Sequence, residues 1–188
     1  MASQIINKLE AACQQLNTAI SLWFNDGNAV SIHTLACSAY QIVHDINRHK
    51  GGRELLYDSL RFKDEYRQQA INHLKRHYNF FKHADHAPAE TVEFDPIITE
   101  LFLIFTSLGL ELLGRSPDEV RGAFNIYYGL RNPHFLTDKG KAEWIDAIQE
   151  ESRKYVLSMP KQQFFEAYTL FLRRNLSGAK PFAPKDSR

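Results

Sequence analysis

An arginine, an amide and a histidine share one side of a helix that the sequence predicts near the middle of the chain. Arg76 and His83 lie seven residues apart with Asn79 between them, and at about 100° per residue all three face one groove. The surrounding segment, 48–83, holds nine Lys/Arg against four Asp/Glu and four of the eight histidines, interleaved with aromatic residues. Such a surface could hold RNA through phosphate contacts and base stacking.

Two simpler interpretations of this stretch stay open. The next segment, 84–120, holds one arginine and eight Asp/Glu, so the basic face could lie beside an acidic neighbour in the same bundle. The residues around Asn79 and His83 also fit a helix end, in which both bond to the backbone and Lys82 offsets the helix dipole. In either case the arginine and the histidine would be structural.

The spacing of Arg76 and His83 resembles a motif of the HEPN superfamily of small all-α proteins. Its ribonuclease members carry an arginine and a histidine separated by four to six residues, often with a polar residue directly after the arginine, as His77 is here. The resemblance implies a helical bundle that pairs as a homodimer and brings two such motifs together over RNA, with no metal or other cofactor. It also implies that His83 acts as general base on a ribose 2′-hydroxyl while Arg76 stabilises charge on the phosphate.

A second group of candidate residues lies on the second predicted helix. His33, Tyr40 and His44 form one stripe together with Cys37, at steps of four, three and four residues. With Glu100 on the later apolar helix, such a stripe could bind a small ligand or a transition metal in the bundle core. The paired Glu-x-x-His motifs of di-iron bundles are absent from the stripe, so we assign it to ligand binding with no metal. The alternative is a polar core network of hydrogen-bonded histidines, with Glu100 as the candidate partner.

The composition is that of one soluble globular domain. The chain has 188 residues, 44% of them hydrophobic and 24% charged, with a formal net charge of +1. These values exclude disordered and disulfide-scaffold classes, and the balanced charge argues against a general binder of nucleic acid or membrane surfaces. Cys13 and Cys37 are predicted to be buried free thiols. The first residues lack a signal-peptide pattern, so we expect a cytoplasmic protein without a membrane partner.

Helical periodicity and capping residues account for almost the whole chain, and no segment alternates as a strand does. Helices are predicted at 3–24, 29–47, 53–60 (a short piece), 63–84, 97–113, 117–131 and 139–157, and a last helix opens at Pro160 and is closed by Gly178. Asp95 and Ser116 are the expected N-caps of two of them, and Gly114 is the expected C′ residue between. The apolar run 97–113 carries two glutamates and is expected in the core rather than in a membrane.

The expected fold is therefore all-α, a single-domain bundle of about six to seven helices with mostly antiparallel neighbours. It covers residues 1–178, and a disordered tail is expected at 179–188.

Three functions remain possible at this point. A HEPN-like protein that binds or cleaves RNA requires Arg76 and His83 to be accessible and to converge. A non-catalytic helical module for a protein partner of unknown identity allows them to point apart or to bond to the backbone. A ligand-binding or metal-binding bundle requires a cavity at His33, Tyr40 and His44.

Overall fold

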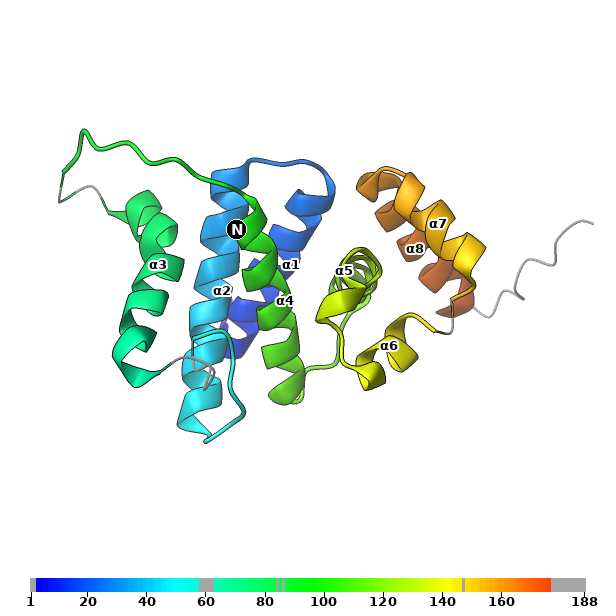
Figure 1. The fold of residues 1–188 in the computed structure, drawn as a ribbon, viewed down its shortest axis with the longest axis horizontal. Helices are drawn as coiled ribbons and strands as arrows, with labels where there is room; N and C mark the ends of the chain where they lie inside the picture. Colours follow the sequence, from blue (N-terminus) through cyan, green and yellow to red (C-terminus); the bar gives the residue numbers. More distant parts are fainter. Residues whose placement is uncertain (1–2, 58–62, 84, 86, 147, 177–188) are drawn as a thin grey trace, which may run out of the picture. The chain divides into compact units, whose positions relative to one another are not determined.

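The computed structural model describes residues 3–57, 63–83, 85, 87–146 and 148–176, and these residues form α-helices and no strands (Figure 1). The all-α prediction is confirmed. Eight α-helices and one short 3-10 helix lie in the described part of the chain: α1 Lys8–Phe24, α2 Ala29–His49, α3 Asp64–Lys82, α4 Ile97–Leu112, α5 Glu119–Arg131, η1 Pro133–Phe135, α6 Asp138–Trp144, α7 Glu150–Ser158 and α8 Lys161–Leu176. The contacts divide the chain into two compact units, residues 1–121 and 122–188, and each is described by itself.

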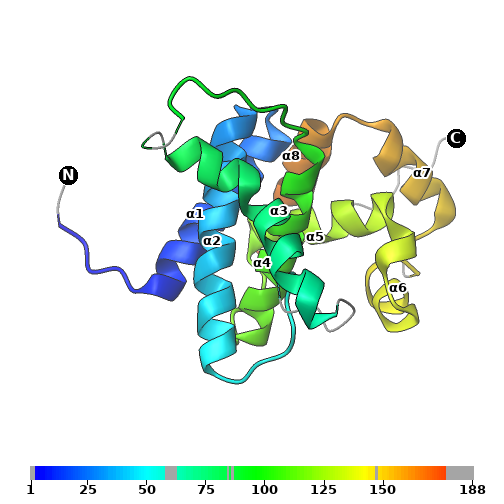
Figure 2. The same cartoon turned by 60° about the vertical axis from the view of Figure 1, so that its left-hand side comes forward.

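Helix α2 is the centre of the first unit and packs against α1, α3 and α4. Figures 1 and 2 show that α1 and α3 run antiparallel to α2, whereas α4 runs parallel to it. The parallel pair is close because α4 has a glycine where the helices meet. A Cβ atom on Gly109 would lie 2.5 Å from Cγ1 of Val43 on α2. Any larger residue at this position would push the two helices apart.

The first helix begins later than its apolar periodicity predicts. The sequence predicts a start at residue 3, but α1 begins at Lys8. Asn7 is its N-cap, and a reciprocal pair of hydrogen bonds between Asn7 and Glu10 forms a capping box. Ile5, which the periodicity places on the buried face, lies before the helix and is fully exposed. The prediction is wrong here because the cap satisfies the free N–H groups at residue 7.

The apolar run forms α4, as predicted, with its first hydrogen bond supplied from outside the helix. The Asp95 carboxylate accepts a hydrogen bond from the backbone N–H of Ile97 at 3.0 Å, and Pro96 rather than Asp95 is the N-cap residue. At the other end Gly114 has a φ of 81°. The N–H groups of Gly114 and Arg115 return to carbonyls of the last turn, which confirms Gly114 as the C′ residue.

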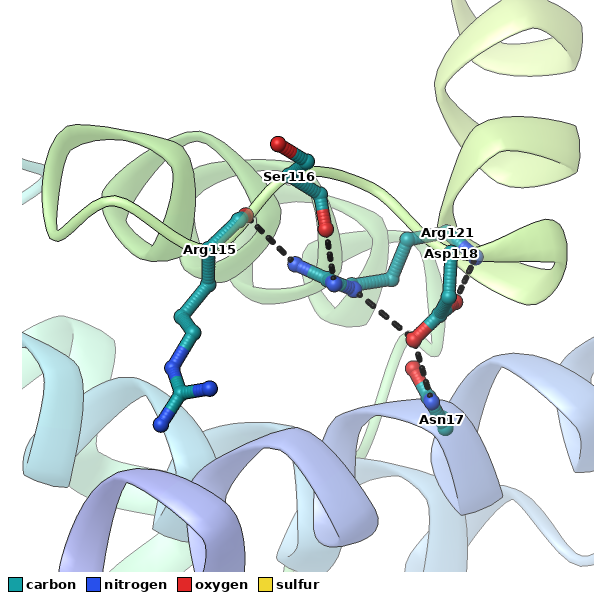
Figure 3. A network of polar contacts seen from close by, with 5 residues as sticks. All are labelled: Asn17, Arg115, Ser116, Asp118 and Arg121. Atoms are coloured by element: carbon teal, nitrogen blue, oxygen red, sulfur yellow. Dashed lines mark hydrogen bonds and ion pairs between the residues drawn. The ribbon is translucent and has the colours of Figure 1, made fainter.

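The start of α5 is fixed by a polar network around a buried arginine (Figure 3). Asp118, not the predicted Ser116, caps the helix by accepting from the N–H of Arg121 at 3.0 Å. The Asp118 carboxylate also bonds the Arg121 side chain and the amide of Asn17 on α1. The Arg121 guanidinium donates to the carbonyls of Arg115 and Ser116. This network ties the α4–α5 turn to α1 inside the first unit.

The segment after α2 is irregular, although a short helix is predicted at 53–60. The described part, 53–57, is held on α2 by side chains instead. Asn47 donates to the carbonyl of Arg53 at 2.6 Å, and the Tyr40 hydroxyl accepts from the N–H of Tyr57 at 3.0 Å. Leu55 and Tyr57 are buried. Residues 56 and 57 form a turn and no helix occupies 53–57, whereas residues 58–60 lie outside the described residues.

The second unit holds the remainder of α5 together with η1, α6, α7 and α8. Helix α5 packs on α8, where the rings of Tyr127 and Phe164 lie 5.0 Å apart and a Cβ on Gly122 would come within 2.9 Å of the Tyr168 hydroxyl. The helix predicted at 139–157 is wrong, because α6 ends at Trp144 and α7 starts at Glu150. Ile145, at the break, is buried, so the chain turns where this side chain enters the core.

Two further expectations concern chain ends and membranes. The break after α5 is confirmed at Asn132, and the predicted tail, 179–188, lies outside the described residues, as does the predicted end of the last helix at Gly178. No helix in the described ranges is long and apolar enough to cross a membrane.

Candidate functional site

The three residues singled out at 76, 79 and 83 line one pocket at the C-terminal end of α3. The pocket has a volume of about 390 Å³ and is open to solvent. Its described lining consists of Arg76, Asn79, Phe80, His83, Asp85, Ala87, Pro88 and Glu90. Helical spacing therefore brings the arginine, the amide and the histidine together, as the sequence predicts.

Helix α3 positions its half of the pocket through its last two turns. Arg76, Asn79 and His83 are all exposed, and one helical turn separates each from the next. The helix ends at Lys82, and His83 takes an extended conformation with φ −125° and ψ 126°. Its backbone N–H still bonds the carbonyl of Asn79 at 3.1 Å. The imidazole is thus carried on the first residue after the helix, with its backbone held by the last turn.

The helix-end interpretation is confirmed for the backbone and not for the side chains. The bond between residues 83 and 79 is between main-chain atoms. Within the described part of the chain, no hydrogen bond or ion pair engages the side chains of Arg76 and His83. Lys82, which is expected to offset the helix dipole, bonds the hydroxyl of Tyr78 at 3.0 Å. The two functional groups of the motif are available to a ligand.

The opposite wall of the pocket comes from the segment after α3. Ala87 has a φ of 49°, a left-handed conformation that a residue with a Cβ rarely adopts. Its carbonyl accepts from the N–H of Glu90 at 2.9 Å, which closes a turn through Pro88. Asp85 and Glu90 bring two carboxylates to the wall. Sequence reasoning missed these four residues, and the only signal of the turn was Pro88.

The segment after α3 is also tied back to that helix at Glu93 and Phe94, beyond the residues that line the pocket. His77 contacts the carbonyl of Glu93 through Nε2 at 3.0 Å. The ring of Phe94 lies 5.1 Å from the rings of both His77 and Phe81. These contacts fix the path of the chain as it leaves the pocket for α4, so the acidic wall is held against the basic end of α3.

The second candidate group forms a buried stripe on α2 that belongs to the core. His33 and Tyr40 are fully buried and His44 is 6% exposed. Nδ1 of His33 lies 2.9 Å from Oγ1 of Thr99, and its Nε2 lies 3.4 Å from Sγ of Cys37. Burial, with a smaller effect of the nearby His77, lowers the pKa of His33 to about 4. This imidazole is neutral at physiological pH.

The other two members of the stripe also have hydrogen-bond partners. The Tyr40 hydroxyl accepts from the backbone of Tyr57 at 3.0 Å, and Nδ1 of His44 lies 3.1 Å from the Asp45 carboxylate. The partner of His33 is Thr99, next to the predicted Glu100. Among the described residues, no group of three or more His, Cys, Asp or Glu side chains is placed to hold a metal ion. The stripe matches the predicted alternative of a hydrogen-bonded polar core.

The cysteines divide between the core and its edge. Cys37 is buried, as predicted, whereas Cys13 is half-buried, and both are free thiols. Burial raises the pKa of the Cys37 thiol far above its ordinary value, so it stays protonated and can donate to a neighbour.

Comparison with protein-family models, with curated proteins and with solved structures finds no match to this chain.

Proposed function

We propose that this protein is a HEPN-like helical protein that binds RNA and cleaves it without metal at the pocket on α3. The observation that carries the proposal is the shared pocket of Arg76, Asn79 and His83, all exposed and lining about 390 Å³. A guanidinium binds phosphate oxygens through several N–H donors. An imidazole can take up and release a proton near neutral pH. Together they provide the two groups that phosphodiester transfer needs.

The reaction assigned to the pocket is transfer of the phosphodiester to the neighbouring ribose hydroxyl. His83 takes the proton of the 2′-hydroxyl while the 2′-oxygen forms a bond to phosphorus. The bond from phosphorus to the 5′-oxygen breaks, and that oxygen takes up a proton. Arg76 stabilises the negative charge that gathers on the phosphate oxygens. The side-chain amide of Asn79 donates a hydrogen bond to the same phosphate oxygens. The products are a 2′,3′-cyclic phosphate and a 5′-hydroxyl.

A homodimer would complete the proton balance of this reaction. One His83 acts as base, so the leaving oxygen needs a protonated group on its other side. The His83 imidazole of a second copy has the right chemistry, if two pockets face each other across the RNA. We propose further that residues 1–178 act as one domain of mostly antiparallel helices in this dimer. Sedimentation equilibrium of the purified protein tests the dimer.

The proposal is tested by RNA cleavage in excess EDTA. The substrate is a labelled single-stranded RNA oligomer that contains all four bases, with a fully 2′-O-methylated copy in parallel. We expect products ending in 2′,3′-cyclic phosphate from the first substrate only, and loss of at least 100-fold in rate with His83→Ala or Arg76→Ala.

The matched control is His73→Ala, since His73 is exposed on the same helix and does not line the pocket. Circular dichroism checks that each variant keeps its helical content. Wild-type protein that leaves the RNA intact, or a His83→Ala variant as active as His73→Ala, would contradict the catalytic proposal. The remaining function would then be a helical module for a protein partner.

A further inference from the structure

The pocket on α3 carries opposite charges on its two walls. Arg76 and His83 stand on the helix side, whereas Asp85 and Glu90 stand on the segment that follows. Phe80 also lines the pocket and is half-buried. A ligand that is only anionic would meet the two carboxylates at a cost. The lining therefore suits a ligand that combines an anionic group for the basic side chains, a flat ring for Phe80 and hydrogen-bond donors for the carboxylates.

We propose that this pocket selects guanine as the base attached to the reacting ribose, with Glu90 as the residue that reads it. This inference rests on the proposed function, because it places the phosphate of the same nucleotide at Arg76 and His83. The base stacks on Phe80, as single-stranded bases do on aromatic side chains in RNA-binding proteins. Its edge then faces the carboxylate wall.

Guanine is favoured by the number and order of its donors. Its Watson–Crick edge presents N1–H and the N2 amino group side by side, so one carboxylate can accept two parallel hydrogen bonds. Adenine and cytosine each present an amino group next to a ring nitrogen lone pair, which repels a carboxylate. Uracil presents one N–H between two carbonyl oxygens. A carboxylate at this edge therefore gains most with guanine, and a bidentate pair discriminates by about 10-fold or more.

Glu90 is better placed for this role than Asp85. Its backbone N–H is fixed to the carbonyl of Ala87 at 2.9 Å, so the turn holds the residue in position. The left-handed backbone of Ala87 is the strained element of that turn. No hydrogen bond or ion pair links the Glu90 carboxylate to another described residue, whereas Asp85 already has an interaction within the chain. The Glu90 side chain is exposed and loses no native contact when it bonds a ligand.

The size of the pocket agrees with a single nucleotide. Sites for small molecules span roughly 300–1,000 Å³, and the volume here is about 390 Å³. One base and one phosphate occupy the lower end of that range. A double-stranded segment would not enter, so the site would take an unpaired nucleotide.

The test measures binding of 3′-mononucleotides by isothermal titration calorimetry in EDTA. These ligands have a base and a 3′-phosphate but no bond to cleave, so the measurement reports base selection independently of catalysis. We expect 3′-GMP to bind about 10-fold tighter than 3′-AMP, 3′-CMP or 3′-UMP. Glu90→Gln should remove that advantage, so that 3′-GMP binds no tighter than the other three nucleotides. Glu65→Gln is the matched control, because Glu65 is an exposed glutamate in the first turn of α3, outside the described lining of the pocket.

The outcomes separate this inference from the proposed function. Equal affinities for the four nucleotides, no detectable binding, or guanine preference that survives Glu90→Gln would each overturn the guanine site. Cleavage of RNA at all bases with equal affinities would keep the ribonuclease and refute the inference. Guanine preference that depends on Glu90 in a protein that cleaves nothing would support the inference and refute the catalytic role.

Discussion

His33 on α2 and Thr99 on α4 are joined in the interior of the first unit, with Nδ1 of the imidazole 2.9 Å from the threonine hydroxyl. Both residues are almost completely buried. The second ring nitrogen lies 3.4 Å from the thiol of Cys37, and the rings of Phe94 and Phe102 lie 5.0 and 5.5 Å away. A polar side chain in such an apolar shell is stable only while both of its nitrogens have partners.

We expect Thr99→Val to lower the free energy of unfolding by about 1–3 kcal/mol, because it keeps the shape of the side chain and leaves Nδ1 of His33 without its partner. Thr99→Ser keeps the hydroxyl and should cost less. Urea unfolding followed by Trp23 fluorescence measures both, in a Trp144→Phe background that leaves Trp23 as the reporter of the first unit. Equal stability of the valine and serine variants would show that the bond contributes nothing.

We expect the first unit to lose stability in mild acid through His33. Burial, and then His77, lower the pKa of this imidazole from 6.5 to about 4, so the unfolded chain takes up a proton that the folded chain does not. The stability is therefore complete above pH 6.5, falls as the pH decreases from 6.5 to about 4, and loses about 3 kcal/mol over that range.

The measurement is the urea midpoint against pH between 7 and 5. A His33→Gln variant should show a flatter slope, although its stability at pH 7 is lower. The control is His49→Gln, which removes an exposed histidine from the end of the same helix and should leave the slope as in the wild type. A His33→Gln slope as steep as the wild-type slope would contradict the prediction.

The Asp118 network should act as a coupled unit. Burial alone would raise the pKa of the Asp118 carboxyl, but the Arg121 N–H, the Asn17 amide and the Arg121 guanidinium together hold it below its ordinary value. Asp118→Ala removes a helix cap and the carboxylate partner of a buried guanidinium, which should cost about 1–3 kcal/mol. Asn17→Ala should cost about 1 kcal/mol.

Because the two residues share one bond of 2.7 Å, the double variant should cost less than the sum of the two single costs. Unfolding of the four proteins in the same Trp144→Phe background completes the cycle. Strict additivity would mean that the contact between Asn17 and Asp118 has no energetic role. The stability that the Asp118 carboxylate contributes should be complete above its ordinary pKa of 3.8 and be lost as the pH falls below that value, whereas the His33 effect lies between pH 6.5 and about 4.

Capping chemistry located some helix boundaries in the sequence and misplaced others. Gly114 is the expected C′ residue because only its φ of 81° lets two N–H groups return to the last turn. Ser116 fits the pattern of an N-cap, yet the helix begins after Asp118. The carbonyl of Ser116 accepts from the Arg121 guanidinium instead. A capping pattern in the local sequence does not predict this contact, because it depends on the burial of the Arg121 side chain.

Of the candidate pocket, the side formed by α3 could be predicted from the sequence, whereas the side formed by the segment after α3 could not. Helical periodicity fixes the directions of Arg76 and Asn79 from sequence alone, and His83, the first residue after the helix, joins them in the pocket. The opposite wall lies in an irregular segment, where spacing along the chain does not determine position. Asp85 and Glu90 reach the pocket through the left-handed turn at Ala87 and the anchor at Glu93. Neither a glycine nor a repeated pattern marks that turn.

The parallel pairing of α2 and α4 sets where the chain can change in length. Two contacts join these helices, His33 with Thr99 and Val43 with Gly109, and the residues of each pair are 66 positions apart in the sequence. The two helices therefore keep the same register along their contact. A residue inserted within either helix between these positions would turn the rest of that helix by about 100°, and one of the two contacts would be lost. An insertion between the helices changes neither. Length variation is therefore compatible with this core in the connecting segments and incompatible with it inside α2 or α4.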